Sequence, residues 1–220
     1  MNGQKARIFI IDDHPLVREW LTNLIDQRDD LMVCGEASDA KEALEAIGPA
    51  APDLAIIDLS LGGGSGTDLI RSIRNLYPKV AMIVLSMHDE RVYAERSIRA
   101  GARGYIMKRE STKKIVEAIH EVLKGNMYLS RELTDLFAEK FVSGGPVNGD
   151  QPTAQLSDRE LEVFQLIGQG YETREIAKSL NVNIKTVQTY CTRIKDKLKY
   201  STGAELLREA VRWNEAHNGR

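Results

Sequence analysis

The chain has 220 residues, of which 42% are hydrophobic and 28% charged, with a formal net charge of -2. This composition is ordinary for a globular protein and excludes disordered and collagen-like chains, and the length suits one large domain or two smaller ones. No run approaches the ~20 apolar residues of a membrane span, and the N-terminus has no apolar stretch typical of a signal peptide, so we expect a cytoplasmic protein without a membrane partner.

Charge and cysteines divide the chain. Residues 1–155 hold 19 Lys+Arg against 23 Asp+Glu, whereas residues 156–220 hold 11 against 9, so the C-terminal part is the basic one. Cys34 and Cys191 stand apart from each other and from any Cys or His cluster, which argues against a disulfide or a zinc site.

The first 125 residues alternate short apolar runs with stretches of helical periodicity. A buried parallel strand is a continuous apolar run, and each pair of such strands needs a crossover helix between them. The runs are Ile8–Ile11, Leu31–Cys34, Leu54–Ile57, Val80–Leu85 and Tyr105–Met107. We therefore predict an α/β domain with a five-stranded, doubly wound parallel sheet of the flavodoxin-like kind.

Chemically active side chains stand where these strands end. Asp12 and Asp13 follow the first strand, Asp58 follows the third, Ser86 follows the fourth and Lys108 follows the fifth. Ligands of such sheets bind at the carboxyl ends of the strands. Each residue alone has an ordinary explanation, such as an aspartate before a turn or a solvated lysine, but their occurrence in strand order favours one site.

Three carboxylates suit Mg²⁺, a cation that prefers oxygen ligands. Asp58 would be a nucleophile toward phosphorus and form an acyl phosphate. The metal and Lys108 would offset charge on the phosphoryl group, and Ser86 would donate a hydrogen bond to it.

Residues 7–125 resemble the receiver domain of two-component response regulators, through the blocks IIDDHPLVRE, DLAIIDLSLGGGSG, IVLSMHDE and AGARGYIMK. A histidine kinase is the partner that this resemblance implies. The roles it implies are a phosphoacceptor at Asp58, a metal site formed by Asp12, Asp13, Asp58 and the backbone carbonyl of Ser60, phosphate-responsive side chains at Ser86 and Lys108, and an aromatic switch at Tyr105.

Two positions depart from the family pattern. Gly62 and Arg109 stand where many relatives have a proline, so we expect a looser loop after Asp58 and a trans peptide between Lys108 and Arg109. The helix that carries Val92, Tyr93, Arg96 and Arg99 presents either a partner face, as in the family, or an ordinary half-buried surface.

Residues 126–153 are predicted to be a linker with a short helix over 131–141, because Ser143–Pro152 is rich in Gly and Pro and poor in apolar residues. This boundary leaves a receiver-like domain over 1–125 and a second domain over 154–220.

The second domain is predicted to be a small all-α helix-turn-helix domain. Ser157 and Glu160 fit a capping box at the start of the first helix. Two further helices, over 174–180 from Thr173 and over 184–198 capped by Asn183, are joined by a three-residue turn. Val187, Cys191, Ile194 and Leu198 form the apolar stripe of the longer helix, in which Cys191 is expected to be a small buried hydrophobe.

The segment LSDRELEVFQLIGQGYETREIAKSLNVNIKTVQTYCTRIKDKL resembles the LuxR-type helix-turn-helix of NarL-class regulators. The resemblance implies binding to double-stranded promoter DNA and a dimer contact on the helix over 202–214. The candidate base-reading positions are Gln188, Thr189 and Thr192, and the candidates for phosphate or base contacts are Lys185, Arg193, Lys195 and Lys199.

We therefore expect a transcriptional regulator controlled by phosphorylation of Asp58, and not an enzyme that turns over. One alternative is a phosphohydrolase with an aspartyl-phosphate intermediate, although Ser60 stands where such an enzyme needs a second acid. Another is a DNA-binding protein whose receiver acts as an interaction module without phosphate.

Overall fold

A computed structural model describes residues 5–61, 65–142 and 152–218. The chain divides into two compact units, Met1–Gly145 and Pro146–Arg220, which are described separately. The glycine loop at 62–64 and most of the Gly/Pro-rich linker, 143–151, lie outside the described residues. No helix among the described residues combines the length and apolar character needed to cross a bilayer.

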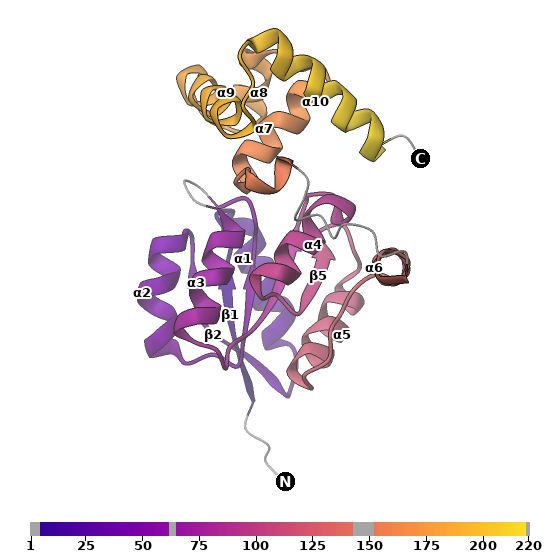
Figure 1. Cartoon of the computed structure of the whole chain (residues 1–220). Coiled ribbons are helices and arrows are strands. Elements are labelled where there is room, and N and C mark those ends of the chain that lie inside the picture. The colour runs from indigo at the N-terminus through magenta and orange to yellow at the C-terminus, as the bar shows by residue number, and fades with distance from the viewer. Residues whose placement is uncertain (1–4, 62–64, 143–151, 219–220) are drawn as a thin grey trace. The chain divides into compact units, whose positions relative to one another are not determined.

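The first unit is built on the five-stranded parallel sheet that the apolar runs predict (Figure 1). Its strand order is β2-β1-β3-β4-β5, so the chain winds outward from β1 in both directions. The strands are β1 (Ala6–Ile11), β2 (Leu31–Ala37), β3 (Leu54–Ile57), β4 (Ala81–Ser86) and β5 (Gly104–Met107).

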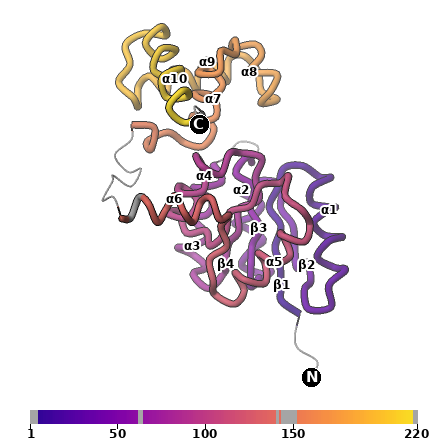
Figure 2. The backbone as a smooth tube through the Cα atoms, turned by 90° about the vertical axis from the view of Figure 1, so that its right-hand side faces the viewer, coloured from indigo at the N-terminus to yellow at the C-terminus, as the bar shows by residue number. Residues whose placement is uncertain are grey.

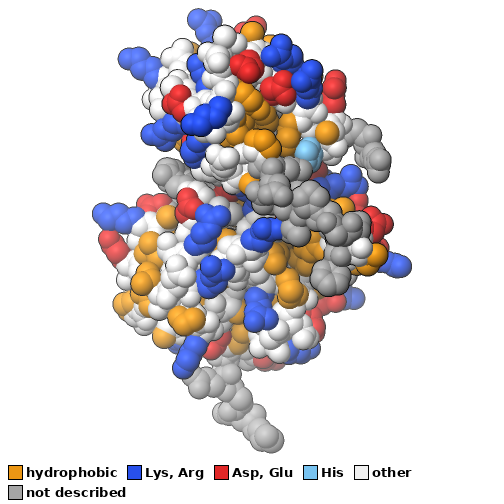
Figure 3. All heavy atoms as spheres, viewed as in Figure 1, with side chains coloured by type: hydrophobic (Ala, Val, Ile, Leu, Met, Phe, Trp, Pro, Cys, Tyr) orange, Lys and Arg blue, Asp and Glu red, His pale blue; other side chains and the backbone are white. Residues whose placement is uncertain are grey.

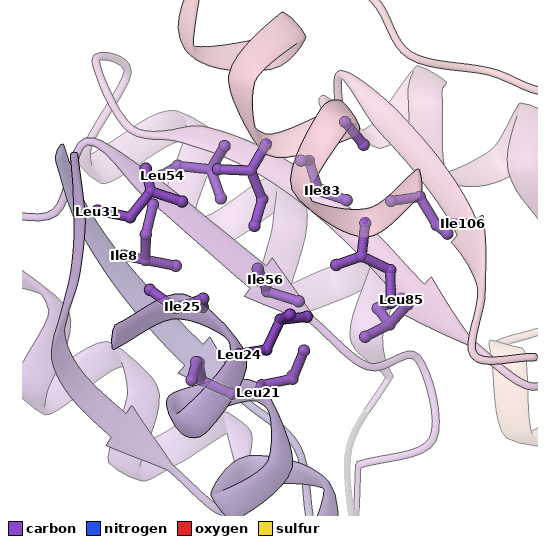
Figure 4. Close-up of a cluster of buried hydrophobic side chains, with 14 of the residues drawn as sticks. Ile8, Leu21, Leu24, Ile25, Leu31, Leu54, Ile56, Ile83, Leu85 and Ile106 are labelled. Atoms are coloured by element: carbon purple, nitrogen blue, oxygen red, sulfur yellow. The ribbon is translucent and has the colours of Figure 1, made fainter. Parts of the chain in front are cut away.

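Helices cover both faces of this sheet. One apolar core lies between the sheet and two helices, α1 (Pro15–Asp26) and α5 (Thr112–Leu123). Figure 4 shows side chains of β1, α1 and β3 meeting there, among them Ile8, Leu21 and Ile56. The other helices, α2 (Ala40–Ala50), α3 (Gly66–Leu76) and α4 (Glu90–Ala100), pack in sequence on the opposite face.

Some strand limits and apolar stripes differ from the sequence prediction. β2 continues past Cys34 to Ala37, because Gly35 and Glu36 pair with β1 although they are not apolar. β4 begins at Ala81, one residue late, since the Val80 amide donates to the Tyr77 carbonyl in a turn. Leu16 and Leu76 continue the helical spacing of apolar residues in α1 and α3, yet they are 79% and 62% exposed.

The predicted helix after the receiver-like part is α6 (Arg131–Val142), and it belongs to the first unit. Its inward side chain Leu133 is buried, and α6 contacts α4 (Figure 2). The residues before it are held at the sheet: Tyr105 donates its amide hydrogen to the Tyr128 carbonyl at 3.1 Å, and Tyr128 donates to Arg103 at 2.9 Å. Residues 126–142 are therefore attached to the sheet and to α4, whereas the sequence predicts that they belong to a linker.

The second unit is all helical within the residues described. The short 3₁₀ turn η2 (Pro152–Gln155) precedes α7 (Asp158–Gly168), α8 (Thr173–Ser179), α9 (Ile184–Leu198) and α10 (Gly203–Asn218). The capping box predicted for α7 is present: Ser157 Oγ accepts from the Glu160 amide, and Glu160 accepts from the Ser157 amide. Thr173 was expected to cap α8, but it lies inside the helix, and Glu172 is the N-cap.

The most extensive helix–helix contact in the second unit is between α7 and α10. Phe164 meets Trp213 edge to face with 6.0 Å between ring centroids, and Leu206 and Ala210 of α10 are buried. Gly168, the last residue of α7, lies against the backbone of Ala210, where a Cβ atom would collide with the carbonyl oxygen. A close helix contact therefore depends on this glycine.

We predict that Gly168→Ala destabilises the second unit by ~1–3 kcal/mol, the usual cost of overpacking against a backbone that cannot move away. Denaturant unfolding in a Trp20→Phe background, monitored by Trp213 fluorescence, measures the effect. Gly203→Ala is the matched control, because no atom lies within 4 Å of its added Cβ; it should leave stability unchanged or raise it by up to about 1 kcal/mol. Equal losses in the two variants would contradict the packing argument.

Candidate functional site

An acidic cluster occupies the carboxyl edge of the sheet. Ligand atoms of Asp12, Asp13, His14 and Asp58 lie within 4.8 Å of one another. The pairing of β1 with β3 causes this, since Ile11 is in register with Ile57 and the aspartates directly follow each strand. The Asp58 amide also donates to the Ile11 carbonyl at 2.8 Å, which anchors the end of β3 to β1.

Lys108 joins the two buried aspartates. Its Nζ lies 2.7 Å from Asp12 Oδ2 and 2.7 Å from Asp58 Oδ2. β5 directs it there, because the Lys108 amide donates to the Ser86 carbonyl of neighbouring β4 at 2.8 Å. Burial disfavours its charge, but the carboxylates of Asp58 and Asp12 more than offset burial and raise the pKa of Lys108. The structure thus brings Asp12, Asp13, Asp58 and Lys108 together at this edge, and the end of β4 at Ser86 is bonded to the backbone of Lys108.

The site carries more negative than positive charge. Asp12 and Asp58 are only 2% and 3% exposed. Burial, and next the negative charge of Asp58, raise the pKa of Asp12 despite hydrogen bonds from Lys108 and from the His14 amide. The carboxylates therefore carry a cost in solvation and mutual repulsion that one ammonium group does not cancel.

Ser86 and Tyr105 lie beside this cluster in the interior. Ser86 is fully buried, and its Oγ accepts from the His88 amide at 3.2 Å. The Tyr105 ring is 1% exposed, and its hydroxyl donates to the His88 carbonyl at 2.9 Å. The aromatic ring at the switch position thus points inward. The described residues contain no cis peptide, so the bond after Lys108 is trans as expected.

Two histidines near the site were missed by the sequence analysis. His14 Nδ1 lies 2.6 Å from Asp13 Oδ1, a contact that is an ion pair only when the imidazole is protonated. His88 Nε2 shares a hydrogen bond with Ser60 Oγ at 2.7 Å. The position of His14 next to two acids was a signal in the sequence. His88 gave none, because it meets Ser60 only through the tertiary fold.

The α4 residues proposed as a partner face are partly core. Tyr93 is fully buried and Val92 is 9% exposed, whereas Arg99 is exposed and pairs with buried Glu95. Since Val92 and Tyr93 pack inward, these four residues do not form one continuous outer surface. The ordinary half-buried interpretation fits this helix.

The polar face of α9 is the candidate nucleic-acid interface. Asn183 caps the helix by accepting from the Thr186 amide at 2.7 Å. Most of the predicted DNA contacts are exposed on α9 or at its end, and Figure 3 shows Lys and Arg side chains on this side of the second unit. These exposed residues are Lys185, Gln188, Thr189, Thr192, Arg193 and Lys199.

The fold distinguishes among these residues. Thr189 and Thr192 donate their hydroxyl hydrogens to the Lys185 and Gln188 carbonyls, one turn back in the same helix. Only their oxygen lone pairs remain to accept from a base, whereas the Gln188 amide can both donate and accept. Lys195 is half-buried and lines a hollow together with Cys191, on a different side from the groove lined by Lys185 and Arg193.

The apolar stripe of α9 is largely as predicted. Val187, Ile194 and Leu198 are buried, while Cys191 is half-buried. On α10, Leu206 packs inward and Leu207 is 48% exposed. The outward face of α10 therefore leaves apolar surface uncovered within this unit.

Comparisons with known proteins agree with both units. The model of the response regulator receiver domain matches residues 8–120, and that of the bacterial regulatory proteins of the luxR family matches residues 154–210. The oxygen regulatory protein NreC of Staphylococcus aureus is 34% identical over 210 residues, which cover 94% of this chain and 97% of that protein.

Solved structures show the same similarity. A LuxR-family two-component response regulator from Aurantimonas is 34% identical over 63% of this chain and 99% of that one, with a TM-score of 0.59. RcsB of Salmonella enterica serovar Typhimurium, solved bound to promoter DNA with the phosphomimetic BeF₃⁻, is 26% identical over 93% of this chain and 97% of that one, with a TM-score of 0.58. This chain therefore belongs to the LuxR-family response regulators, transcriptional regulators that combine a receiver domain with a DNA-binding helix-turn-helix domain.

Proposed function

We propose that Asp58 accepts a phosphoryl group from a sensor histidine kinase and that this modification controls DNA binding by the second unit. The observation that carries the proposal is the position of Asp58, whose Oδ2 lies 2.7 Å from Lys108 Nζ, inside the acidic cluster. A carboxylate held beside an ammonium group and a metal-binding set has the parts that phosphoryl transfer requires.

The donor set at the sheet edge fits Mg²⁺. Its side chains offer carboxylate oxygens from Asp12, Asp13 and Asp58, and the backbone carbonyl of Ser60 would add a fourth oxygen. The excess negative charge of the buried carboxylates is itself a reason for a cation to bind there. When bound, Mg²⁺ would neutralise charge on the phosphoryl oxygens as the Asp58 oxygen attacks phosphorus.

The surrounding side chains have separate tasks. Lys108 would pair with a phosphoryl oxygen once Asp58 is phosphorylated and its carboxylate no longer carries a charge. The Ser86 oxygen accepts from the His88 amide, so its own hydrogen remains to be donated to the phosphoryl group. The inward Tyr105 donates its hydroxyl hydrogen to the His88 carbonyl and would hold that state.

A hydrolase with an aspartyl-phosphate intermediate is less well supported. Such an enzyme needs a general base near Asp58 to activate water, and the residue two positions later is Ser60, whose hydroxyl is hydrogen-bonded to His88. The luxR-family match of the second unit would also be unexplained.

For the second unit we propose that α9 enters the major groove of promoter DNA in the bacterial cytoplasm. Gln188 would read a base edge, while Lys185, Arg193 and Lys199 would contact phosphates. The exposed apolar side of α10 would pair with a second copy, so that a two-fold dimer matches two half-sites.

Asp58→Asn should abolish phosphorylation by a small acyl phosphate donor in the presence of Mg²⁺, because the amide cannot form the acyl phosphate. Intact-mass spectrometry with hydroxylamine treatment measures it, and Asp68→Asn, an exposed aspartate of α3, is the control. A hydroxylamine-labile phosphate on the Asp58→Asn variant would overturn the assignment. Equal DNA affinity before and after phosphorylation of the unaltered protein would instead support a phosphate-independent receiver.

Mg²⁺ should raise the unfolding midpoint of the first unit, and Asp12→Asn should remove most of that rise. At a free concentration 100 times its Kd, a ligand stabilises the native state by about 2.7 kcal/mol. In EDTA, Asp12→Asn should itself raise the midpoint, because the raised pKa of Asp12 means that stability is lost as the pH increases through it.

This gain in EDTA should shrink as the pH falls below the raised pKa of Asp12 and vanish below the ordinary aspartate pKa of the unfolded chain, where the carboxyl is protonated in both states. Differential scanning fluorimetry over a pH series measures both effects. Asp29→Asn, an exposed aspartate between α1 and β2, is the control and should keep the full Mg²⁺ shift. A variant Asp12→Asn with an undiminished Mg²⁺ shift would exclude this residue from the metal site.

Gln188→Ala should cost ~1–3 kcal/mol of binding to the specific site and relax the preference at one base pair. Lys185→Ala should weaken all DNA sequences similarly and reduce the slope of log K against log salt by ~0.9. Binding titrations at several salt concentrations separate the two, with Lys113→Ala in α5 as the control. A uniform loss in Gln188→Ala would show that this residue does not read a base.

A further inference from the structure

His88 lies at the junction between β4 and α4 and contacts four parts of the first unit. Its ring meets Ser60 in the loop after Asp58 and stacks on Tyr93 of α4. Its backbone meets Ser86 at the end of β4 and Tyr105 of β5. His88 thus joins the loop of the phosphoacceptor to Ser86 and to the aromatic switch residue Tyr105.

The ring contacts hold the loop and the helix together. Ser60 Oγ and His88 Nε2 share a hydrogen bond of 2.7 Å. On its flat side, the imidazole stacks on Tyr93 with 4.5 Å between centroids and an interplanar angle of 25°. Because Tyr93 is fully buried, it gives the ring a fixed support. A displacement of Ser60 is therefore transmitted to α4 through one rigid side chain.

The backbone contacts connect the same residue to the switch. The amide of His88 donates to Ser86 Oγ at 3.2 Å, and its carbonyl accepts from the Tyr105 hydroxyl at 2.9 Å. Any movement of Ser86 toward a phosphoryl group must carry this amide along or break the bond. Both routes act on the residue that directly precedes the N-cap of α4, Asp89.

The first turn of α4 is in turn attached to the start of α6. Glu90 Oε1 accepts from Ser130 Oγ at 2.8 Å, and Arg91 forms a salt bridge with Glu132. Leu133, next in sequence, is buried. The chain beyond α6 leads to the second unit, so α6 is the last helix described in the first unit.

We propose that His88 is a positioning residue that couples the loop after Asp58 to the first turn of α4, and that α6 receives this signal through Glu90 and Arg91. His88 takes no part in the transfer of the phosphoryl group. The inference rests on the proposed phosphorylation of Asp58, and it adds the route by which that event reaches the end of the first unit.

The test uses the full chain with Mg²⁺ and beryllofluoride as the phosphoryl mimic. Bound beryllofluoride is detected by ¹⁹F NMR, and amide hydrogen exchange is followed in peptides that cover residues 127–142. In the unaltered protein, beryllofluoride should bind and change the exchange rates of these peptides at least threefold. Absence of the bound ¹⁹F signal in that protein would refute the phosphoacceptor proposal and this inference together.

Two variants separate the contacts of His88. His88→Phe keeps a ring that can stack on Tyr93 and removes the bond to Ser60, and Ser60→Ala removes the same bond from the other side. His88→Phe should retain bound beryllofluoride, and in both variants the change in exchange at 127–142, compared at equal occupancy by the ¹⁹F signal, should fall at least threefold. His120→Phe, a histidine of α5 that pairs with Asp30, should behave as the unaltered protein.

The outcomes exclude a merely structural role. If both variants transmit the full change, His88 is not the coupling residue. If both lose the bound ¹⁹F signal, the residue serves ligand binding and the coupling proposal is wrong. A folding defect in His88→Phe would appear in its unfolding midpoint, and Ser60→Ala then decides alone.

The α6 step has its own test. Arg91→Glu should lower the change in exchange at 127–142, because two negative side chains would face each other. The double variant Arg91→Glu with Glu132→Arg restores opposite charges and should recover most of the change. If the double variant stays as impaired as Arg91→Glu, the signal does not pass through this pair.

Discussion

The buried bridge from Lys108 to Asp12 and Asp58 is the interaction on which the rest of this protein depends. One ammonium group, 2.7 Å from each carboxylate, holds together the ends of three strands whose order brings them to one edge. One ammonium group beside three carboxylates leaves the site short of positive charge, and burial together with the negative charge of Asp58 raises the pKa of Asp12. The proposed cation and phosphoryl group would therefore act on charges that are already unbalanced.

The same edge carries the connections that lead away from the site. Ser86, Tyr105 and Ser60 all meet at His88, and α4 begins immediately after it. The α6 segment is attached to both β5 and α4 and so belongs to the receiver unit. A change at the strand ends has a packed route to α6, whereas coupling through a free linker would transmit little.

In the second unit, α9 carries both a part of the buried core and an exposed polar face. α9 buries Val187 and Ile194 and exposes a polar face, so its outward side chains can be exchanged without loss of the core. On that face the hydroxyls of Thr189 and Thr192 donate to backbone carbonyls of the same helix. The side-chain amide of Gln188 can both donate and accept a hydrogen bond. In the proposed complex with DNA, base recognition would thereby be concentrated in few side chains, while lysine and arginine would supply contacts that do not depend on sequence.

Sequence alone determined the five strands, the capping box of Ser157 and the helix-turn-helix pattern, because each rests on local periodicity and local residue types. It also determined the residues that follow the strands, because parallel pairing must bring the carboxyl ends of the strands to one edge of the sheet. Tertiary structure alone decided the remainder. Leu16 and Leu76 follow the helical period yet stay exposed, since packing partners and not periodicity decide burial. The attachment of α6 and the bond between Ser60 and His88 arise from residues distant in the chain, whose proximity no local pattern records.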